Sequence, residues 1–326
     1  MKHITILVTS GSNLASIENP RRGFLAVNEY LESQGKVPLF KTQLAGLTKE
    51  VELGKGMYTV RPDVEIRNLK KTDLIIIPAF GGDIRKELEQ NKAFIPWIIR
   101  QYQAGAEIAS LCVGAFLLAA TGLLKGKHCS THWLATNDFK MMFPDVKLLT
   151  DKIITDEHRI YTSGGSFSSA NLILYIIEKY AGRAIAIHCA KIFQIDIERC
   201  SQSPFIIFQG QKDHEDDQVK QAQEFIEKNY QEKIKVSQLT TMFALSRRNL
   251  ERRFKKATTN TVVEYIQRVK VEAAKKNFET GRKNVNEVMY EAGYSDTKAF
   301  RAVFKKITGL SPVDYRNKYN KEAMVL

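Results

Sequence analysis

The sequence predicts a layered α/β domain with a parallel sheet, followed by an all-α domain that contains two helix-turn-helix units. Three observations lead to this prediction: strand-like and helix-like segments alternate over the first two thirds, a 50-residue repeat occupies the last third, and the positive charge is concentrated in that last third. The length of 326 residues suits two domains. A hydrophobic share of 44% and a charged share of 26% are those of a folded protein.

The first two thirds have the pattern of an open parallel sheet. Three apolar runs bounded by turn residues have the length of strands buried on both faces: Ile4–Val8, Leu74–Pro78 and Ile108–Cys112. Three segments have helical spacing: Gly23–Glu32, Ala93–Tyr102 and Ala170–Tyr180. Residues 152–163 have the pattern of a hairpin. This alternation predicts a flavodoxin-like layered sheet with right-handed crossovers and a ligand crevice beyond the carboxyl ends of its strands.

Two features at the ends of predicted strands are suited to chemistry. Cys112 lies where a strand passes directly into a helical run, in the pattern Ser110-x-Cys112-x-Gly114, so its sulfur is expected to enter the crevice near a helix N-terminus, where a thiolate is favoured. The pair Gly81-Gly82 follows another strand, and its backbone N–H groups are suited to a ligand oxygen. A free cysteine is more often a small buried hydrophobe, and that interpretation stays open.

Three stretches of this region resemble the PfpI-type, or class I glutamine amidotransferase-like, superfamily: DLIIIPAFGGD, EIASLCVGAFLLAATGLLKGKHCSTHW and RIYTSGGSFSSANLILYIIEKYAG. For its enzymes, the resemblance implies a histidine partner, often directly after the cysteine, and an acidic residue after the first strand. Here Val113 follows the cysteine, Glu18 is the acidic residue after the first strand, and His132 is the nearest alternative partner. We expect a pocket without a catalytic relay and with no catalytic residue. Its candidate effector contacts are Gly81, Gly82, Cys112, Val113, His132 and Trp133.

Residues 196–217 break the apolar periodicity and end in an acidic cluster. They are predicted to link a domain over residues 1–195 to a second domain over residues 218–326. The run PFIIF within this segment is too apolar for a free tether, so part of the segment is expected to pack on a domain.

Charge separates the two predicted domains. Through Asp217 the chain has 26 Lys and Arg against 24 Asp and Glu, and after it 23 against 12, so +11 of the net +13 lies in the last 109 residues. A concentrated positive field attracts polyanions, and nucleic acid is the commonest such partner. A lysine-rich domain that is merely well solvated is the alternative.

The last third contains an internal repeat. Ser246, Leu250 and Phe254 recur 50 residues later as Asp296, Phe300 and Phe304. Each copy has the pattern of a helix, a turn and a second helix that starts at a capping residue, over residues 236–258 and 284–308. A helical stretch over residues 262–278 joins the two copies, Gly293 suits a tight turn, and Ser311-Pro312 is expected to begin the last helix.

Helical geometry divides the second helix of each copy into two faces. Leu250 and Phe254 share the face that must be core, and Arg248, Arg252 and Lys255 cluster opposite, as a helix in a DNA major groove requires. For Arg247 and Arg253, at the border of these faces, a DNA-backbone contact and an internal salt bridge both remain open. The residues expected to contact DNA are Arg247, Arg248, Asn249, Arg252, Lys255, Thr297, Lys298, Arg301 and Lys305.

Two such units joined by a long helix resemble the AraC-type DNA-binding domain, and the second copy carries the pattern nearly intact as VNEVMYEAGYSDTKAFRAVFKKITGLSPVDYR. The first copy departs from it at Thr240, where small residues are usual. The order of the two domains resembles the GlxA-like transcriptional regulators. The resemblance implies a ligand-responsive, sequence-specific transcription factor of the cytoplasm and its nucleoid, which binds promoter DNA, a small-molecule effector of unknown identity, a second copy of itself and RNA polymerase.

Other classes of function make different demands on the sequence. The alternative is an amidase, glyoxalase or hydratase-like enzyme that uses Cys112, and a third class is a redox sensor oxidised at the same residue. We expect no cofactor and no metal, because the four cysteines show no close-paired ligand spacing. We expect no membrane partner, because no run approaches the roughly 18 to 20 apolar residues of a membrane span.

Overall fold

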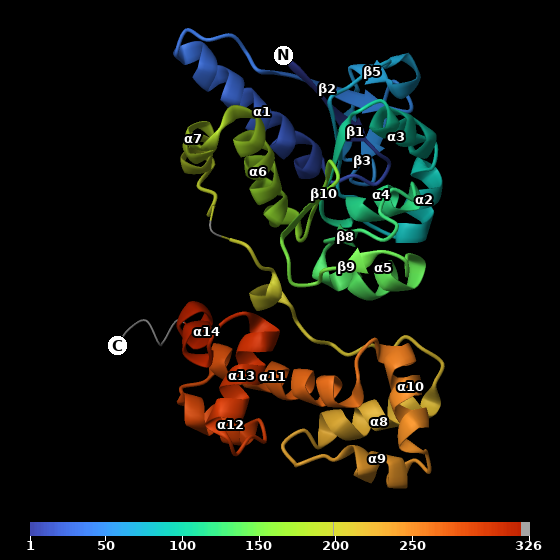
Figure 1. The fold of residues 1–326 in the computed structure, drawn as a ribbon, viewed down its shortest axis with the longest axis vertical. Coiled ribbons are helices and arrows are strands. Elements are labelled where there is room, and N and C mark those ends of the chain that lie inside the picture. Colours follow the sequence, from blue (N-terminus) through green and yellow to red (C-terminus); the bar gives the residue numbers. More distant parts are fainter. Residues whose placement is uncertain (198, 321–326) are drawn as a thin grey trace. The chain divides into compact units, whose positions relative to one another are not determined.

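The structure is a computed structural model, and it describes residues 1–197 and 199–320. The chain divides into two compact units, Met1–Gln202 and Ser203–Leu326, which are described one at a time. The boundary falls inside the segment 196–217 that the sequence marks as a linker. Figure 1 shows an α/β unit in blue to green and a helical unit in yellow to red.

The first unit is built on a seven-stranded sheet with the order β10-β11-β7-β6-β1-β2-β5. Its strands are β1 (Lys2–Val8), β2 (Phe40–Gly46), β5 (Val64–Glu65), β6 (Leu74–Ile77), β7 (Glu107–Ser110), β10 (Ile154–Glu157) and β11 (Ile160–Ser163). Every pairing is parallel except that of β10 with β11, which is the predicted hairpin. The predicted parallel sheet is therefore confirmed, and β2 and β5 extend it beyond the three strands that the apolar runs indicated.

Helices cover both faces of this sheet (Figure 1). One face carries α1 (Leu14–Ser33), α6 (Ser169–Ala181) and α7 (Arg183–Phe193), and the other carries α2 (Ile84–Asn91), α3 (Phe94–Gln103) and α4 (Ala115–Ala120). Successive residues of a strand point to opposite faces. Ile4 and Ile6 accordingly pack in the core below α1 and α6, whereas Leu7 packs in the second core with Phe94 and Phe116.

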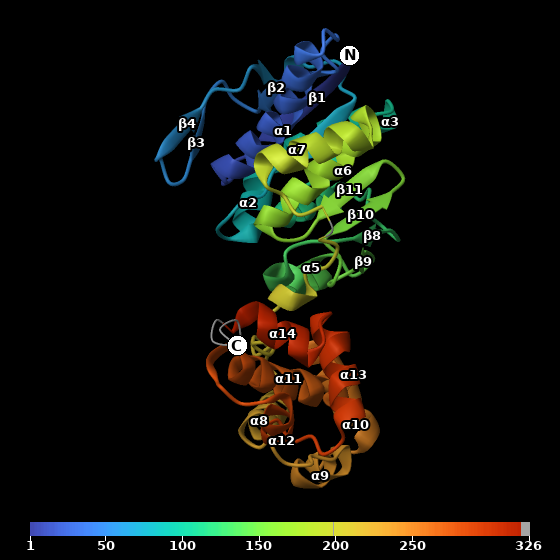
Figure 2. The same ribbon diagram turned by 90° about the vertical axis from the view of Figure 1, so that its left-hand side faces the viewer.

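Smaller elements complete the first unit. The hairpin of β3 (Val51–Leu53) and β4 (Tyr58–Val60) stands away from the main sheet (Figure 2). Beyond the carboxyl end of β7 lie β8 (His128–Cys129), α5 (Thr136–Met142) and β9 (Lys147–Leu148). Within the described residues, short 3₁₀ turns lie at Ile66–Asn68, Cys112–Gly114, Trp133–Ala135, Ser166–Ser168 and Ser203–Phe205. Among the described helices, none is long and apolar enough to cross a membrane.

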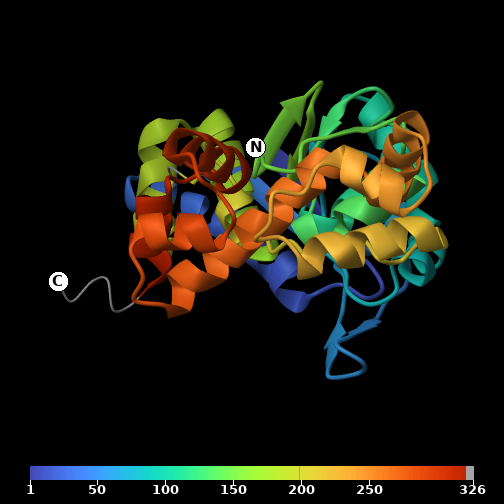
Figure 3. The same cartoon turned by 90° about the horizontal axis from the view of Figure 1, so that it is seen from below.

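The second unit is helical, with α8 (Asp217–Lys228), α9 (Val236–Met242), α10 (Arg247–Thr258), α11 (Val262–Thr280), α12 (Val285–Glu291), α13 (Thr297–Thr308) and α14 (Pro312–Tyr319). It has two cores, one among α8 to α10 and one among α12 to α14. The helix α11 belongs to both, because Tyr265 packs in the first core and Phe278 in the second. Figure 3 shows the two halves of this unit on either side of the orange α11.

Capping residues set where the helices of the second unit begin. The hydroxyl of Ser246 accepts the N–H of Asn249 at the start of α10, and the carboxylate of Asp296 accepts the N–H of Ala299 at the start of α13. Ser311 likewise caps α14, with a proline in its first turn. The predicted starts of these three helices are confirmed.

The turns of the two copies differ in chemistry. In the second copy Gly293 has a φ of +73°, a conformation that glycine adopts without strain. In the first copy Ala244 takes the left-handed conformation, with a φ of +50°. A nonglycine residue in this conformation costs about 1 to 2 kcal/mol, so the first turn depends more on the packing around it.

Residues between the boundary and α8 pack on the second unit. The ring of Phe208 lies 5.1 Å from that of Tyr265, and the N–H of Phe208 donates to Glu272 at 3.1 Å. The amide of Asn260 donates to the side-chain oxygen of Gln211 at 3.1 Å. Within the apolar run of the predicted linker, Phe208 thus packs against the first core, whereas Phe205 and Ile207 are exposed.

Lys270 of α11 connects the two halves of the second unit. Its buried ammonium donates to the carbonyl of Glu232, in the loop before α9, at 3.2 Å, and to the carbonyl of Gly293, in the turn before α13, at 2.8 Å. Gly293 also approaches this loop closely, since a Cβ placed on it would lie 2.2 Å from the carbonyl oxygen of Gln231. The second turn is therefore fixed to the first half of the unit.

Candidate functional sites

The helix α10 presents a basic surface opposite its core. Leu250 and Phe254 are fully buried, whereas Arg248, Arg252 and Lys255 are exposed. Two more side chains of this helix are predicted to contact DNA: Arg247 is exposed and bonded to Glu251 at 3.0 Å, and Asn249 is half-buried. The face of α10 that is free to enter a DNA groove thus consists mainly of positively charged side chains.

The helix α13 repeats this arrangement. Phe300 and Phe304 are fully buried. On the opposite side Lys298, Arg301 and Lys305 are exposed, and Thr297 at the start of the helix is half-buried. Both copies therefore offer a helix N-terminus and basic side chains to the same kind of ligand, an extended polyanion.

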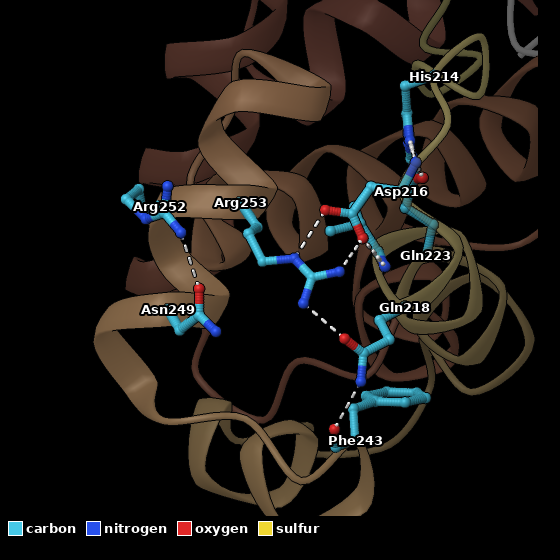
Figure 4. A network of polar contacts seen from close by, with 9 residues as sticks. His214, Asp216, Gln218, Gln223, Phe243, Asn249, Arg252 and Arg253 are labelled. Atoms are coloured by element: carbon cyan, nitrogen blue, oxygen red, sulfur yellow. Dashed lines mark hydrogen bonds and ion pairs between the residues drawn. The ribbon is translucent and has the colours of Figure 1, made fainter.

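Arg253 belongs to a different environment from its neighbour Arg252. Its guanidinium donates to both carboxylate oxygens of Asp216, at 2.8 and 2.5 Å, and to Gln218 at 2.5 Å. The pair with Arg253 holds the pKa of the Asp216 carboxyl below its ordinary value. Figure 4 shows Arg253 pointing toward Asp216 while Arg252 points away and donates to Asn249. Of the two roles left open for Arg253, the structure has the internal salt bridge.

In the first unit, Cys112 begins the 3₁₀ turn that connects β7 to α4, in a strained conformation. Its φ is +54°, which L residues rarely adopt, and only 4% of its surface is exposed. Its sulfur lies 3.7 Å from the hydroxyl of Ser166, its N–H donates to Ser163 at 3.4 Å, and its carbonyl accepts from Thr131 at 3.0 Å. Burial raises the pKa of the Cys112 thiol, so the protonated form is favoured.

His132 and Glu18, the residues nearest to the positions that a catalytic relay would need, have other partners. Nδ1 of His132 accepts the N–H of Leu134 at 3.1 Å, so the neutral ring carries its proton on Nε2. Burial lowers the pKa of His132, which favours this neutral form. The carboxylate of Glu18 accepts from Nε of Arg21 at 2.6 Å and from Nη2 at 2.8 Å, and this contact lowers its pKa. Because Nε2 of His132 carries the ring proton and Nδ1 already accepts a hydrogen bond, neither nitrogen is free to take a proton as a general base would.

The glycine pair lies at the carboxyl end of β6. The N–H of Gly81 donates to the carbonyl of Gly11, in the loop after β1, at 2.9 Å. Gly82 has a φ of +89°. The carboxylate of Glu87 lies beside the loop after β1 and the loop after β6, because a Cβ on Gly11 would be 2.4 Å from it and a Cβ on Gly82 would be 3.7 Å from it. The Gly81 N–H is thus used within the protein, and the acidic groups at these loops are Asp83, which caps α2, and Glu87.

Comparison with known proteins places each unit in a family. The DJ-1/PfpI family matches residues 27–179, and a helix-turn-helix domain matches residues 239–318. The chain combines a DJ-1/PfpI domain with an AraC-type helix-turn-helix domain. Both basic helices and all but residues 236–238 of the repeat lie within the second match, and the cysteine turn lies within the first.

The relatives of the two domains include regulators and an enzyme. The HTH-type transcriptional regulator GbdR of Pseudomonas aeruginosa is 24% identical over 258 residues, which are 79% of this chain and 69% of GbdR. An isonitrile hydratase of Pseudomonas putida is 25% identical over 146 residues, 45% of this chain and 60% of that enzyme. The crystal structure of an AraC family transcriptional regulator from Pseudomonas putida has a TM-score of 0.51 and 16% identity, over 59% of this chain and all of that one. At this identity the structure shows the fold alone.

Several neighbours of the two sites were not expected from the sequence. In the DJ-1/PfpI domain, Thr131, Ser163 and Ser166 surround Cys112 with hydroxyl groups. The serine-rich run that begins at the end of β11 is the signal that could have indicated the two serines. In the helix-turn-helix domain, the helical faces also carry Glu251, Ala299 and Ala302, which a search for basic residues passes over.

Proposed function

We propose that this protein is a sequence-specific DNA-binding transcriptional regulator whose helix-turn-helix domain reads promoter DNA through α10 and α13. The observation that carries the proposal is the repeat: two capped helices, each with a buried aromatic face and an exposed cationic face, in the part of the chain that holds +11 of the net +13 charges. A single basic helix is often only well solvated. Two copies with the same division of faces favour a shared ligand with a regular repeat.

The long helix α11 sets the separation of the two recognition helices. Its 19 residues span about 28 Å at 1.5 Å per residue. Successive major-groove segments on one face of a duplex are about 34 Å apart. We therefore expect α10 and α13 to enter neighbouring segments of the same groove, with Lys and Arg at their outer edges on phosphates.

The DJ-1/PfpI domain is proposed to sense a small molecule and to mediate dimerisation. Of the candidate effector contacts expected from the sequence, Gly81 is left out because its N–H already donates to Gly11. The others are Gly82, Cys112, Val113, His132 and Trp133, to which the hydroxyls around Cys112 are added. A protonated thiol and an Nε2–H donor suit the binding of a polar ligand better than its turnover. The effector must bind two conformations or two dimer arrangements with different affinity, since otherwise it regulates nothing.

The regulator is proposed to act in the cytoplasm, on the nucleoid, as a homodimer that influences RNA polymerase at a promoter. The test of the central proposal is fluorescence anisotropy of the full-length protein on DNA from upstream of its own gene, against a scrambled duplex, at two salt concentrations. We expect preference for the upstream DNA and a steep decrease of affinity with salt. Equal, weak binding to both duplexes would contradict this operator assignment.

Two substitutions test the assigned faces. Arg248→Ala and Lys298→Ala each remove an exposed cation from a recognition helix, and we expect weaker DNA binding with an unchanged fold. Loss of a base contact costs about 1 to 3 kcal/mol of binding free energy and relaxes the sequence preference. Loss of a phosphate contact lowers the affinity evenly across sequences and reduces the slope of log affinity against log salt concentration by about one. Lys36→Ala, an exposed charge in the other domain, is the matched control. Wild-type affinity in both helix variants would show that other faces meet the DNA.

A second candidate function is a Cys112-dependent enzyme with an attached DNA-binding domain. The similarity of the first domain to an isonitrile hydratase is the observation that favours it. This candidate requires turnover of an isonitrile, amide or aldehyde that Cys112→Ser abolishes while DNA binding survives. We expect no turnover on such a panel, because the thiol is held protonated and His132 is not placed as a base.

A further inference from the structure

The two recognition helices can be compared position by position. They are offset by 50 residues, and each begins at a side-chain cap that accepts the N–H three residues later. Leu250 and Phe300 are buried at matched positions, as are Phe254 and Phe304. Residues that share a position in the two copies therefore point in the same direction from their helix axes.

One position lies opposite the core in both helices. At 100° per residue, the direction midway between Leu250 and Phe254 is opposite to that of Arg252. Arg252 is exposed, and its Nη2 donates to Oδ1 of Asn249 at 3.0 Å, with its side chain pointing away from that of Arg253 (Figure 4). The matched residue of α13 is Ala302, which is also exposed. The centre of one face is thus a guanidinium held by a neighbour, and the centre of the other is a methyl group.

The remaining positions fall into two groups. Three matched positions are basic in both copies: Arg248 with Lys298, Lys255 with Lys305, and Lys256 with Lys306. Four differ in the chemistry that they offer to a base: Arg247 with Thr297, Asn249 with Ala299, Glu251 with Arg301, and Arg252 with Ala302. Cations common to both helices suit phosphates, which are alike at every step of DNA. Sequence information must come from the positions that differ.

We propose that the matched pair Arg252 and Ala302 gives α10 and α13 different base preferences, so that the operator consists of two dissimilar sub-sites. Arg252 selects guanine in the α10 sub-site, because its fork fits the O6 and N7 acceptors. Ala302 selects thymine at the equivalent step of the α13 sub-site, because its methyl group packs on the C5-methyl group of that base. This inference rests on the proposed function.

The test exchanges the two residues. Full-length wild-type protein, Arg252→Ala, Ala302→Arg and the double exchange each select binding sites from a randomised duplex library. At the base pair that Arg252 contacts in the α10 sub-site, Arg252→Ala should reduce the preference for guanine by about 5- to 150-fold. The base preferences in the α13 sub-site should stay as in the wild type. Ala302→Arg should gain a guanine preference at the equivalent step of the other sub-site. In the double exchange, the guanine preference should move from one sub-site to the other.

The controls separate readout from affinity and folding. Both exchanged residues are exposed, so the thermal unfolding of the variants should match that of the wild type. Lys256→Ala removes a cation that both copies share, and it should lower affinity without changing any base preference. A wild-type protein that enriches a sequence, together with exchanges that leave every preference in place, would overturn this inference alone. A wild-type protein that enriches no sequence would overturn it together with the proposed function.

Discussion

Arg253 and Asp216 form a two-point ion pair, with Nε 2.8 Å from Oδ2 and Nη2 2.5 Å from Oδ1. The contact joins the middle of α10 to the residue that caps α8, because Asp216 also accepts the N–H of Val219. Arg252, one residue earlier, lies exposed on the other side of the helix. Consecutive arginines thus have different functions, one in the domain's structure and one on its proposed DNA surface.

This difference predicts opposite phenotypes for the two arginines. Arg253→Ala should lower the free energy of unfolding of the helix-turn-helix domain by about 1.5 to 3 kcal/mol, because it leaves a mostly buried carboxylate without its cation. Arg252→Ala should leave stability unchanged and weaken DNA binding. Chemical denaturation and anisotropy measure the two quantities. Loss of DNA binding by Arg253→Ala without loss of stability would contradict the structural role.

The same ion pair predicts a pH dependence. The pKa of Asp216 is lowered in the folded state, so its stabilising effect is present at neutral pH and is lost as the pH falls below about 4, through its folded-state pKa. The stability difference between the wild type and Asp216→Asn should therefore shrink with acidification. A difference that stays constant between pH 7 and pH 3 would exclude this linkage.

His132 should titrate below the ordinary histidine value of about 6.5. Burial disfavours its charged form, so the unfolded chain binds this proton more readily, and the contribution of His132 to stability falls as the pH decreases below about 6.5. NMR titration of the ring protons measures the pKa, with His132→Gln as the assignment control. A midpoint above 6.5 would indicate a charged partner and would favour the enzyme candidate.

Thiol labelling should distinguish the two kinds of cysteine. Cys200 is exposed, whereas Cys112 is 4% exposed and its pKa is raised. Iodoacetamide at neutral pH should therefore modify Cys200 before Cys112, as mass spectrometry of the digested protein would show. The Cys200→Ser variant should label slowly throughout. Rapid labelling of Cys112 would reveal an activated thiolate, which the enzyme and redox-sensor interpretations require.

The turn of the second copy gives a further prediction. Gly293→Ala places a Cβ 2.2 Å from the carbonyl oxygen of Gln231 and 2.6 Å from Nζ of Lys270, in addition to the strain of a φ of +73°. Gly122 has nearly the same φ, +76°, with nothing within 4 Å. Gly122→Ala should thus cost only the backbone strain, about 1 to 2 kcal/mol. Gly293→Ala should cost more and also reduce DNA binding. Equal costs in the two domains would contradict the close packing of this turn.

The sequence predicted the elements whose pattern is local. The strands β1, β6 and β7 are apolar on both faces and are easily identified, whereas β2 contains Lys41 and Gln43 and has no clear period. The recognition helices were predicted through the repeat and their caps, since both signals lie within a few residues. The residue range of α1 was underestimated, because Pro20 and two arginines interrupt the apolar pattern of its first half.

The surroundings of the two sites were harder to predict because they depend on contacts between distant residues. The role of Arg253 is decided by Asp216, 37 residues earlier, and the environment of Cys112 by Ser163 and Ser166, more than 50 residues later. Helical periodicity places Arg253 only at the border of two faces. Which partner it meets follows from how α8 packs on α10, and the periodicity of a single helix does not contain that information.

The bridge that Lys270 makes between the loop before α9 and the turn before α13 has a consequence for affinity. Because the two reading helices are joined before DNA is met, engagement of the second is an intramolecular event at a high effective concentration. Little orientational freedom is then left to lose at that step. Each helix alone covers only a few base pairs and would hold DNA weakly. When the two helices are held at a fixed distance, they should bind a correctly spaced pair of sub-sites much more tightly than either helix binds its own sub-site.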